Sequence, residues 1–233
     1  MAMKRAVLFG ATGLVGRALL QHLLEDDAYG KVIAVVRNEL PFTHPRLQTV
    51  VIDFRQLGDC RQFLEGADIF CCLGTTMKKA GSREAFRTVD YQYPLEIARL
   101  AKEEGASQFL IITAIGANSR SVFFYNRVKG ELEEALRELA LPSLHMFHPS
   151  LLLGTRQEQR RSEELSAKLS HSLSFLWIGP LRAYQPVTAT NVAGAMHHIA
   201  SLGLAGAHAY ESRELPQLAR SGKKDELTFI RIG

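Results

Sequence analysis

The stretch Gly10-Ala11-Thr12-Gly13-Leu14-Val15-Gly16 directly follows the apolar run Ala6–Phe9 and opens a helical pattern that extends to about residue 24. A glycine-rich turn between a buried strand and a helix is the context in which a dinucleotide fingerprint occurs. We expect Gly10 to make the tight exit from the strand, Gly13 to let the backbone approach a pyrophosphate, and Gly16 to let the helix pack closely. The alternative is an ordinary turn that carries glycines, and the rest of the chain must decide between the two.

Strand and helix patterns alternate along the first two thirds of the chain. Apolar runs occur at 31–36, 47–52, 67–73, 108–113 and 143–148, and helical patterns at 61–64, 83–104 and 125–139. Strands that are apolar on both faces are typical of a parallel sheet covered by helices on both sides. The sequence therefore predicts an α/β fold with a doubly wound parallel sheet.

The length of 233 residues suits one domain. We expect residues 1–150 to form the cofactor half, and residues 150–233 a small extension that packs on the sheet and faces the substrate. In the extension, helices are expected at 157–173 and 189–201, and short apolar pieces at 207–210 and 227–232.

Composition argues against several classes of protein. No apolar run approaches the length of a membrane span, and the first apolar run ends in glycines, as a strand does and a signal peptide does not. We therefore expect a cytoplasmic protein. The three cysteines (Cys60, Cys71, Cys72) fit neither a disulfide framework nor a zinc site, so no metal is expected. The net charge of +4 is spread along the sequence, and we expect neither nucleic acid nor a membrane as a partner.

The ends of the second and third strands bear on the choice of cofactor. Proteins that bind NAD usually place an acidic residue at the end of the second strand, where it accepts a hydrogen bond from the ribose 2′-hydroxyl. This chain has Arg37, which suits a 2′-phosphate and favours NADP over NAD; the alternative is an exposed loop cation. Asp53 follows the third strand, where it either accepts from the adenine amino group or caps a helix or turn.

Leu73-Gly74-Thr75 follows the fourth strand. A glycine at this edge lets a cofactor lie across the carboxyl ends of the strands.

Tyr125 and Lys129 are four residues apart and share one face of the expected helix. A nearby cation, together with an oxidised nicotinamide, is expected to favour the phenolate form of the tyrosine. Such a tyrosine moves a proton to or from a substrate oxygen while a cofactor moves a hydride. Lys129 is also a candidate to hold the nicotinamide ribose. Thr113 ends the preceding strand, and its hydroxyl is a candidate to orient the substrate oxygen.

Four stretches resemble the atypical short-chain dehydrogenases/reductases, and more closely their Tat-interacting-protein (CC3-type) branch. They are the glycine loop and the segments 70–76, 125–133 and 148–158. The resemblance implies a Rossmann-type NADP(H)-binding fold, with Thr113, Tyr125 and Lys129 as the catalytic set. It also implies that the backbone from Pro149 to Leu151 borders the nicotinamide. The residues expected at the cofactor are Gly10, Thr12, Gly13, Leu14, Val15, Gly16, Arg37, Asp53, Phe54, Leu73, Gly74, Thr75, Thr113, Tyr125, Lys129, Pro149 and Leu151.

Two positions depart from that branch. Thr113 stands where serine is more usual, and His148 stands where arginine usually precedes the proline.

The sequence as a whole predicts an NADP(H)-dependent oxidoreductase that acts on a small carbonyl, alcohol or sugar-nucleotide-like substrate. The alternative is a non-catalytic NADPH-binding regulator or scaffold. A homodimer or a protein partner is compatible with both.

Overall fold

Seven parallel strands form the central sheet of the computed structural model, which describes residues 3–153 and 186–230. The strand order is β3-β2-β1-β4-β5-β6-β9, and every neighbouring pair is parallel. The strands are β1 (Lys4–Phe9), β2 (Tyr29–Val36), β3 (Leu47–Val51), β4 (Asp68–Cys71), β5 (Gln108–Ile112), β6 (Ser143–His148) and β9 (Gly206–Glu211). This arrangement confirms the predicted Rossmann-type doubly wound sheet.

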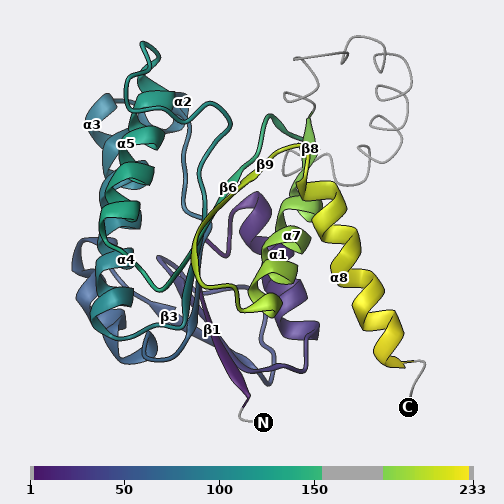
Figure 1. Cartoon of the computed structure of the whole chain (residues 1–233). Helices are drawn as coiled ribbons and strands as arrows, with labels where there is room; N and C mark the ends of the chain where they lie inside the picture. Colours follow the sequence, from purple (N-terminus) through teal and green to yellow (C-terminus); the bar gives the residue numbers. More distant parts are fainter. Residues whose placement is uncertain (1–2, 154–185, 231–233) are drawn as a thin grey trace.

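Helices cover both faces of the sheet (Figure 1). One face packs against α1 (Leu14–Glu25) and α7 (Ala189–Leu202), and the other against the 3-10 helix η1 (Phe54–Phe63), α4 (Tyr93–Glu103) and α5 (Phe124–Glu138). The alternation of side chains along a strand explains the two cores. Ala6 and Leu8 of β1 point to the first face, whereas Val7 and Phe9 point to the second.

The long helix expected at 83–104 is divided into α3 (Arg83–Arg87), the π-helical turn η2 (Thr88–Gln92) and α4. Pro94 lies in the first turn of α4 and has no N–H to continue the α-helical hydrogen bonds. The N–H of Tyr93 instead bonds to the carbonyl of Thr88, five residues earlier. In this wider turn Asp90 is buried, with 1% of its surface exposed. A short helix α2 (Met77–Ala80), which the sequence did not indicate, precedes α3.

The C-terminal part of the described chain adds one strand to the sheet and two helices to one face. The sequence predicted a short apolar piece at 207–210 without assigning it to a strand or helix. In the structure it belongs to the edge strand β9, which pairs with β6. Its alternating side chains stack on that strand: His208 on His145, and Tyr210 on Phe147. The piece at 227–232 begins within α8 (Leu215–Ile230), which packs on α7. The helix expected at 157–173 lies outside the described residues.

A short two-stranded sheet stands beside the main one, where β7 (Leu152–Leu153) pairs with β8 (Val187–Thr188). It connects the segment after β6 to the start of α7.

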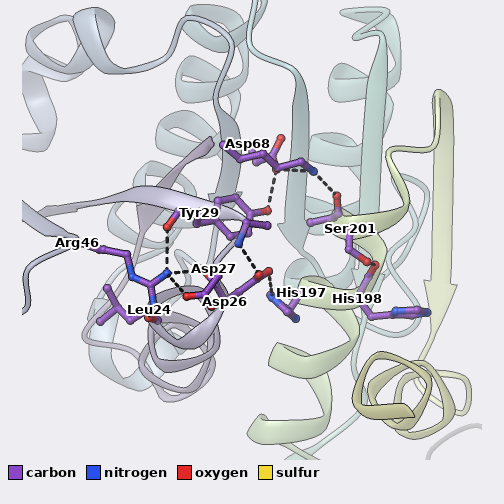
Figure 2. A network of polar contacts seen from close by, with 12 residues as sticks. Leu24, Asp26, Asp27, Tyr29, Arg46, Asp68, His197, His198 and Ser201 are labelled. Carbon is purple, nitrogen blue, oxygen red and sulfur yellow. Dashed lines mark hydrogen bonds and ion pairs between the residues drawn. The ribbon is translucent and has the colours of Figure 1, made fainter. Parts of the chain in front are cut away.

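A polar network at the amino ends of the strands joins α7 to the first half of the chain (Figure 2). Tyr29 donates a hydrogen bond of 2.7 Å to the buried carboxylate of Asp68, and Nε2 of His197 lies 2.8 Å from Oδ2 of Asp26. The His197 contact holds the pKa of Asp26 below its ordinary value. Arg46 donates to the carbonyl of Asp26 at the end of α1. These contacts fix the position of α7, which also contributes to the pocket described next.

Candidate active site

The glycine loop is built by close approaches that side chains would block. Gly10 has a φ of +85°, and a Cβ there would lie 2.6 Å from the carbonyl oxygen of Cys72. A Cβ on Gly16 would lie 2.1 Å from the carbonyl oxygen of Gly10. The loop therefore rests against the end of β4, and the first turn of α1 rests against the loop. The predicted roles of Gly10 and Gly16 in tight turning and close packing agree with these distances.

The amino end of α1 is suited to an anion. Its N-cap is Gly13, no side chain caps it, and the first turn carries no acidic residue. Unpaired N–H groups and the positive end of the helix dipole favour a phosphate at such a position.

One pocket of about 1810 Å³ brings together most of the residues predicted at the cofactor. Those on its wall are Thr12, Gly13, Leu14, Val15, Leu73, Gly74, Thr75, Thr113, Tyr125, Lys129 and Pro149. The carboxyl ends of parallel strands meet at one edge, and this explains why segments from distant parts of the sequence share the pocket.

The other predicted residues lie elsewhere. Gly10 and Gly16 form the loop but are absent from the pocket wall, as are Arg37, Asp53, Phe54 and Leu151. Arg37 is exposed directly after β2, and Leu151 is 68% exposed after β6.

Asp53 and Phe54 both have partners within the protein. Asp53 caps η1 by accepting from the N–H of Arg55, and its carboxylate also pairs with the Arg55 guanidinium at 2.6 Å. These contacts hold the pKa of Asp53 below its ordinary value. The structure therefore shows the helix-capping alternative for Asp53. The side chain of Phe54 is buried against Phe9 and Tyr93, so it belongs to the core.

A buried ion pair lies beneath the predicted catalytic lysine. Nζ of Lys129 is 2.8 Å from Oδ1 of Asp90, and the two side chains are 3% and 1% exposed. The other oxygen of Asp90 accepts a 2.9 Å hydrogen bond from the backbone N–H of Thr75. Burial lowers the pKa of Lys129, but the Asp90 carboxylate outweighs burial and the net pKa is raised. Lys129 is therefore a fixed cation.

Tyr125 lies at the start of α5, with 38% of its surface exposed and its ring 5.6 Å from that of Phe86. Partial burial raises its pKa, Lys129 lowers it, and Asp90 raises it again; the net pKa lies above the ordinary value. Lys129 therefore favours the phenolate, as expected, but burial together with Asp90 outweighs its effect on the pKa of Tyr125. The expected contribution of an oxidised nicotinamide stays a prediction.

Thr113 donates its hydroxyl hydrogen to a carboxylate that the sequence reading did not single out. Its Oγ1 is 2.6 Å from Oε1 of Glu133, which is 4% exposed. Nε2 of His148 lies 2.8 Å from the same carboxylate oxygen, close enough for an ion pair although without hydrogen-bond geometry. Nδ1 of His148 faces Glu211 at 3.3 Å. Burial lowers the pKa of His148, but Glu133 and Glu211 together raise it above the ordinary value.

Three residues of the site were missed in the sequence. Arg17 follows the glycine loop on α1 and lines both the large pocket and a neighbouring one of about 550 Å³. Its position directly after the last glycine of the loop could have indicated Arg17 as a candidate from the sequence. Asp90 and Glu133 are acidic residues within helical patterns, and only the fold shows that they are buried. Within the described residues, no group of His, Cys, Asp and Glu is arranged to hold a metal ion.

The geometry defines a dinucleotide-binding protein of the Rossmann type, and comparisons with known proteins agree. Residues 10–142 match the family described as NAD(P)H-binding. The solved structure of MoeE5 in complex with UDP-glucose and NAD superposes with a TM-score of 0.65, covering 93% of this chain and 81% of that chain at 14% identity. At this identity the likeness concerns the fold.

Relatives in sequence define the family more closely. Protein HTATIP2 of Rattus norvegicus is 33% identical over 228 residues, which cover 96% of this chain and 93% of the relative. Protein FMP52, mitochondrial, of Lodderomyces elongisporus is 31% identical over 211 residues, covering 86% and 88%. The chain belongs to the HTATIP2-like branch of the atypical short-chain dehydrogenases/reductases, an NAD(P)H-binding family.

Removing the charge of Asp90 should destabilise the protein strongly. Asp90→Asn leaves the Lys129 ammonium buried without a carboxylate, which costs about 3–5 kcal/mol for a buried pair. In the double variant Asp90→Asn/Lys129→Met both charges are gone, and the loss should be smaller than the sum of the two single losses. Urea unfolding of the four proteins measures this coupling. Additive losses would show that the two side chains do not interact.

His148 should make stability depend on pH. Its folded pKa is raised, so its stabilising contribution is complete below the unfolded pKa of about 6.5 and disappears as pH rises through the folded pKa. His148→Gln should therefore lose on the order of 1 kcal/mol relative to wild type in mildly acidic buffer and less in alkaline buffer. Thermal or urea unfolding across that range measures the difference, and two parallel stability curves would contradict it.

Proposed function

We propose that the protein is an NADP(H)-dependent oxidoreductase of the short-chain dehydrogenase type. Its substrate would be a small carbonyl, alcohol or sugar-nucleotide-like molecule. The observation that carries the proposal is that Tyr125 and Lys129 share one pocket with the uncapped amino end of α1. A proton-transfer group and an anion-binding loop then face the same space.

The residues present fit a nicotinamide dinucleotide. A Cβ at Gly10 or Gly16 would collide with backbone, so the close path of this loop requires glycine at both positions. Thr12, Gly13 and Leu14 would hold the pyrophosphate, and Gly74 and Thr75 would border the cofactor where it crosses the sheet. When bound, the cofactor supplies or accepts the hydride.

The side chains then have distinct tasks. Tyr125 in its neutral form donates a proton to a substrate carbonyl oxygen, and in the reverse direction its phenolate takes a proton from an alcohol. Lys129 keeps a positive charge beside the phenol, which stabilises the phenolate left after proton donation. Thr113 gives its hydroxyl hydrogen to Glu133, so it meets the substrate or Tyr125 as a hydrogen-bond acceptor. This refines the expectation that its hydroxyl orients the substrate oxygen.

The preference for NADP(H) over NAD(H) is proposed from Arg37, which is exposed at the carboxyl end of β2. Arg37→Ala should weaken NADPH by about 10- to 100-fold, because a charge-assisted hydrogen bond to the 2′-phosphate is lost, and should leave NADH unchanged. Thermal shift and titration with both nucleotides measure this. Lys31→Ala, at the other end of the same strand, is the matched control.

Selective NADPH binding that is lost only in Arg37→Ala would support the cofactor assignment. Equal loss in the Lys31 variant, or no shift with either nucleotide in the wild type, would overturn it.

Tyr125→Phe tests the catalytic part separately. Loss of the phenolic proton should lower turnover by about 10²- to 10⁴-fold while NADPH still stabilises the protein. The measurement is NADPH oxidation with a panel of carbonyl compounds, followed by the variant on any substrate found. Unchanged turnover in the variant would show that Tyr125 does not transfer the proton.

A non-catalytic NADPH-binding regulator or scaffold is the second candidate. The observation in its favour is that Lys129 and Thr113 both have their polar groups engaged by buried carboxylates. A partner protein that is captured only with NADPH, together with no turnover on the carbonyl panel, would support this candidate.

We also propose a cytoplasmic location, which rests on the sequence. The names of the FMP52 relatives include the word mitochondrial and favour a different location.

A further inference from the structure

Two exposed apolar residues directly precede the start of α5, close in sequence to the pocket residue Tyr125. Val122 and Phe123 are adjacent in the loop that leads into α5, and they are 85% and 71% exposed. In Figure 1 this teal loop projects beyond the ends of α2 and α5. Two large apolar side chains at the end of a projecting loop have no evident role in packing, and such exposed apolar groups often mark an interaction site.

Two arginines lie over the ring of Phe124, next to the tip, and a third precedes the tip in the same loop. The guanidinium carbons of Arg83 and Arg127 lie 5.0 and 5.8 Å from the ring centroid of Phe124, and Arg120 is two residues before Val122. Arg127 also donates to the carbonyl of Ser121, which braces the loop. We call Arg83, Arg120, Val122, Phe123 and Arg127 the wedge surface. Among the described residues, no ion pair with a carboxylate neutralises these arginines.

The neighbouring helix extends the positive charge. Lys78 and Lys79 of α2 are exposed, and Lys79 also lines the pocket together with Tyr125. The sequence predicts no membrane as a partner. The packing of α2 on α3, however, brings cations that are scattered in the sequence closer together, and this supports a different inference. Glu84 is the exposed carboxylate on α3 beside Arg83.

We propose that the wedge surface docks on an anionic lipid bilayer, with Val122 and Phe123 inserted among the acyl chains and the arginines paired with headgroup phosphates. Long cationic side chains reach from apolar surroundings to phosphates, and basic clusters beside apolar anchors bind anionic membranes. No described helix is long and apolar enough to cross a membrane, and a peripheral contact of this kind needs none. Docking would turn the mouth of the pocket toward the membrane.

A bilayer fits better than a protein partner. The centre of a stable protein interface is depleted in charge and buries far more apolar surface than two side chains provide. Here two arginines lie against Phe124, the residue after the two apolar groups, and Arg120 is two residues before them, which suits the boundary between acyl chains and headgroups.

Vesicle co-sedimentation tests the proposal without cofactor or substrate, so its result is independent of the proposed function. The probes are vesicles of phosphatidylcholine with phosphatidylglycerol, and vesicles of phosphatidylcholine alone. Val122→Ser/Phe123→Ser removes the apolar tip, and Arg83→Gln/Arg120→Gln removes two charges. Phe123 is the N-cap of α5, where serine is favoured, so the serine variant is expected to fold. Phe42→Ser, at another exposed phenylalanine, is the matched control.

Wild type should bind the anionic vesicles, more weakly at high salt, and each double variant should bind on the order of tenfold more weakly. Phe42→Ser should bind like wild type. The proposal is overturned if wild type does not bind, if Phe42→Ser loses as much, or if the serine variant keeps full binding. Binding to polyglutamate in place of vesicles would overturn it in favour of an acidic protein partner.

Discussion

The buried ion pair of Asp90 and Lys129 is the interaction on which the site depends. It joins the π-helical turn before α4 to α5, and the second oxygen of Asp90 holds the backbone of Thr75 after β4. A buried pair is tolerated only when its geometry is good and its remaining hydrogen-bonding groups are satisfied. The π-turn supplies that geometry, because it places a carboxylate inward at a position where Pro94 prevents a regular helix. A local irregularity of the backbone therefore sets the position of the proposed catalytic lysine.

A second buried carboxylate, Glu133, holds side chains of other elements in a similar way. Glu133 sits one turn after Lys129 on α5, and it engages Thr113 from β5 and His148 from β6. Helix α5 therefore presents a cation and an anion, each matched by a group from another element. The resemblance predicts an arginine before Pro149, whereas this chain has His148 there. His148 is a positively charged partner for Glu133 only while its ring is protonated. The exchange makes this contact sensitive to pH, which an arginine would not be.

The positions of apolar residues along the sequence were enough to predict most of the fold. The strands and helices of the first 150 residues follow from apolar runs and helical spacing, and the parallel sheet follows from their alternation. The edge strand β9 was not predicted as a strand, because three of its six residues are glycine or alanine, and the stacking of Tyr210 on Phe147 appears only in the fold. The position of Tyr125 and Lys129 in the pocket could be predicted from their spacing and from the strand before them. The burial of Asp90 and Glu133 could not be predicted, because a charged residue in a helical pattern normally lies on the exposed face of the helix. Only the tertiary packing shows that these two carboxylates are buried.

The protonation state of Tyr125 follows from this arrangement of charges. A lysine beside a phenol favours the phenolate, but burial of Tyr125 raises its pKa, and the Asp90 carboxylate within the same ion pair raises it further. The protein without cofactor therefore holds a phenol that is ready to donate a proton. Under the proposed function, reduction of a carbonyl needs that neutral form, whereas oxidation of an alcohol needs the phenolate. The positive ring of an oxidised nicotinamide adds the charge that Lys129 cannot supply alone. Under the proposed function, the charge of an oxidised nicotinamide would shift Tyr125 toward the phenolate that alcohol oxidation needs.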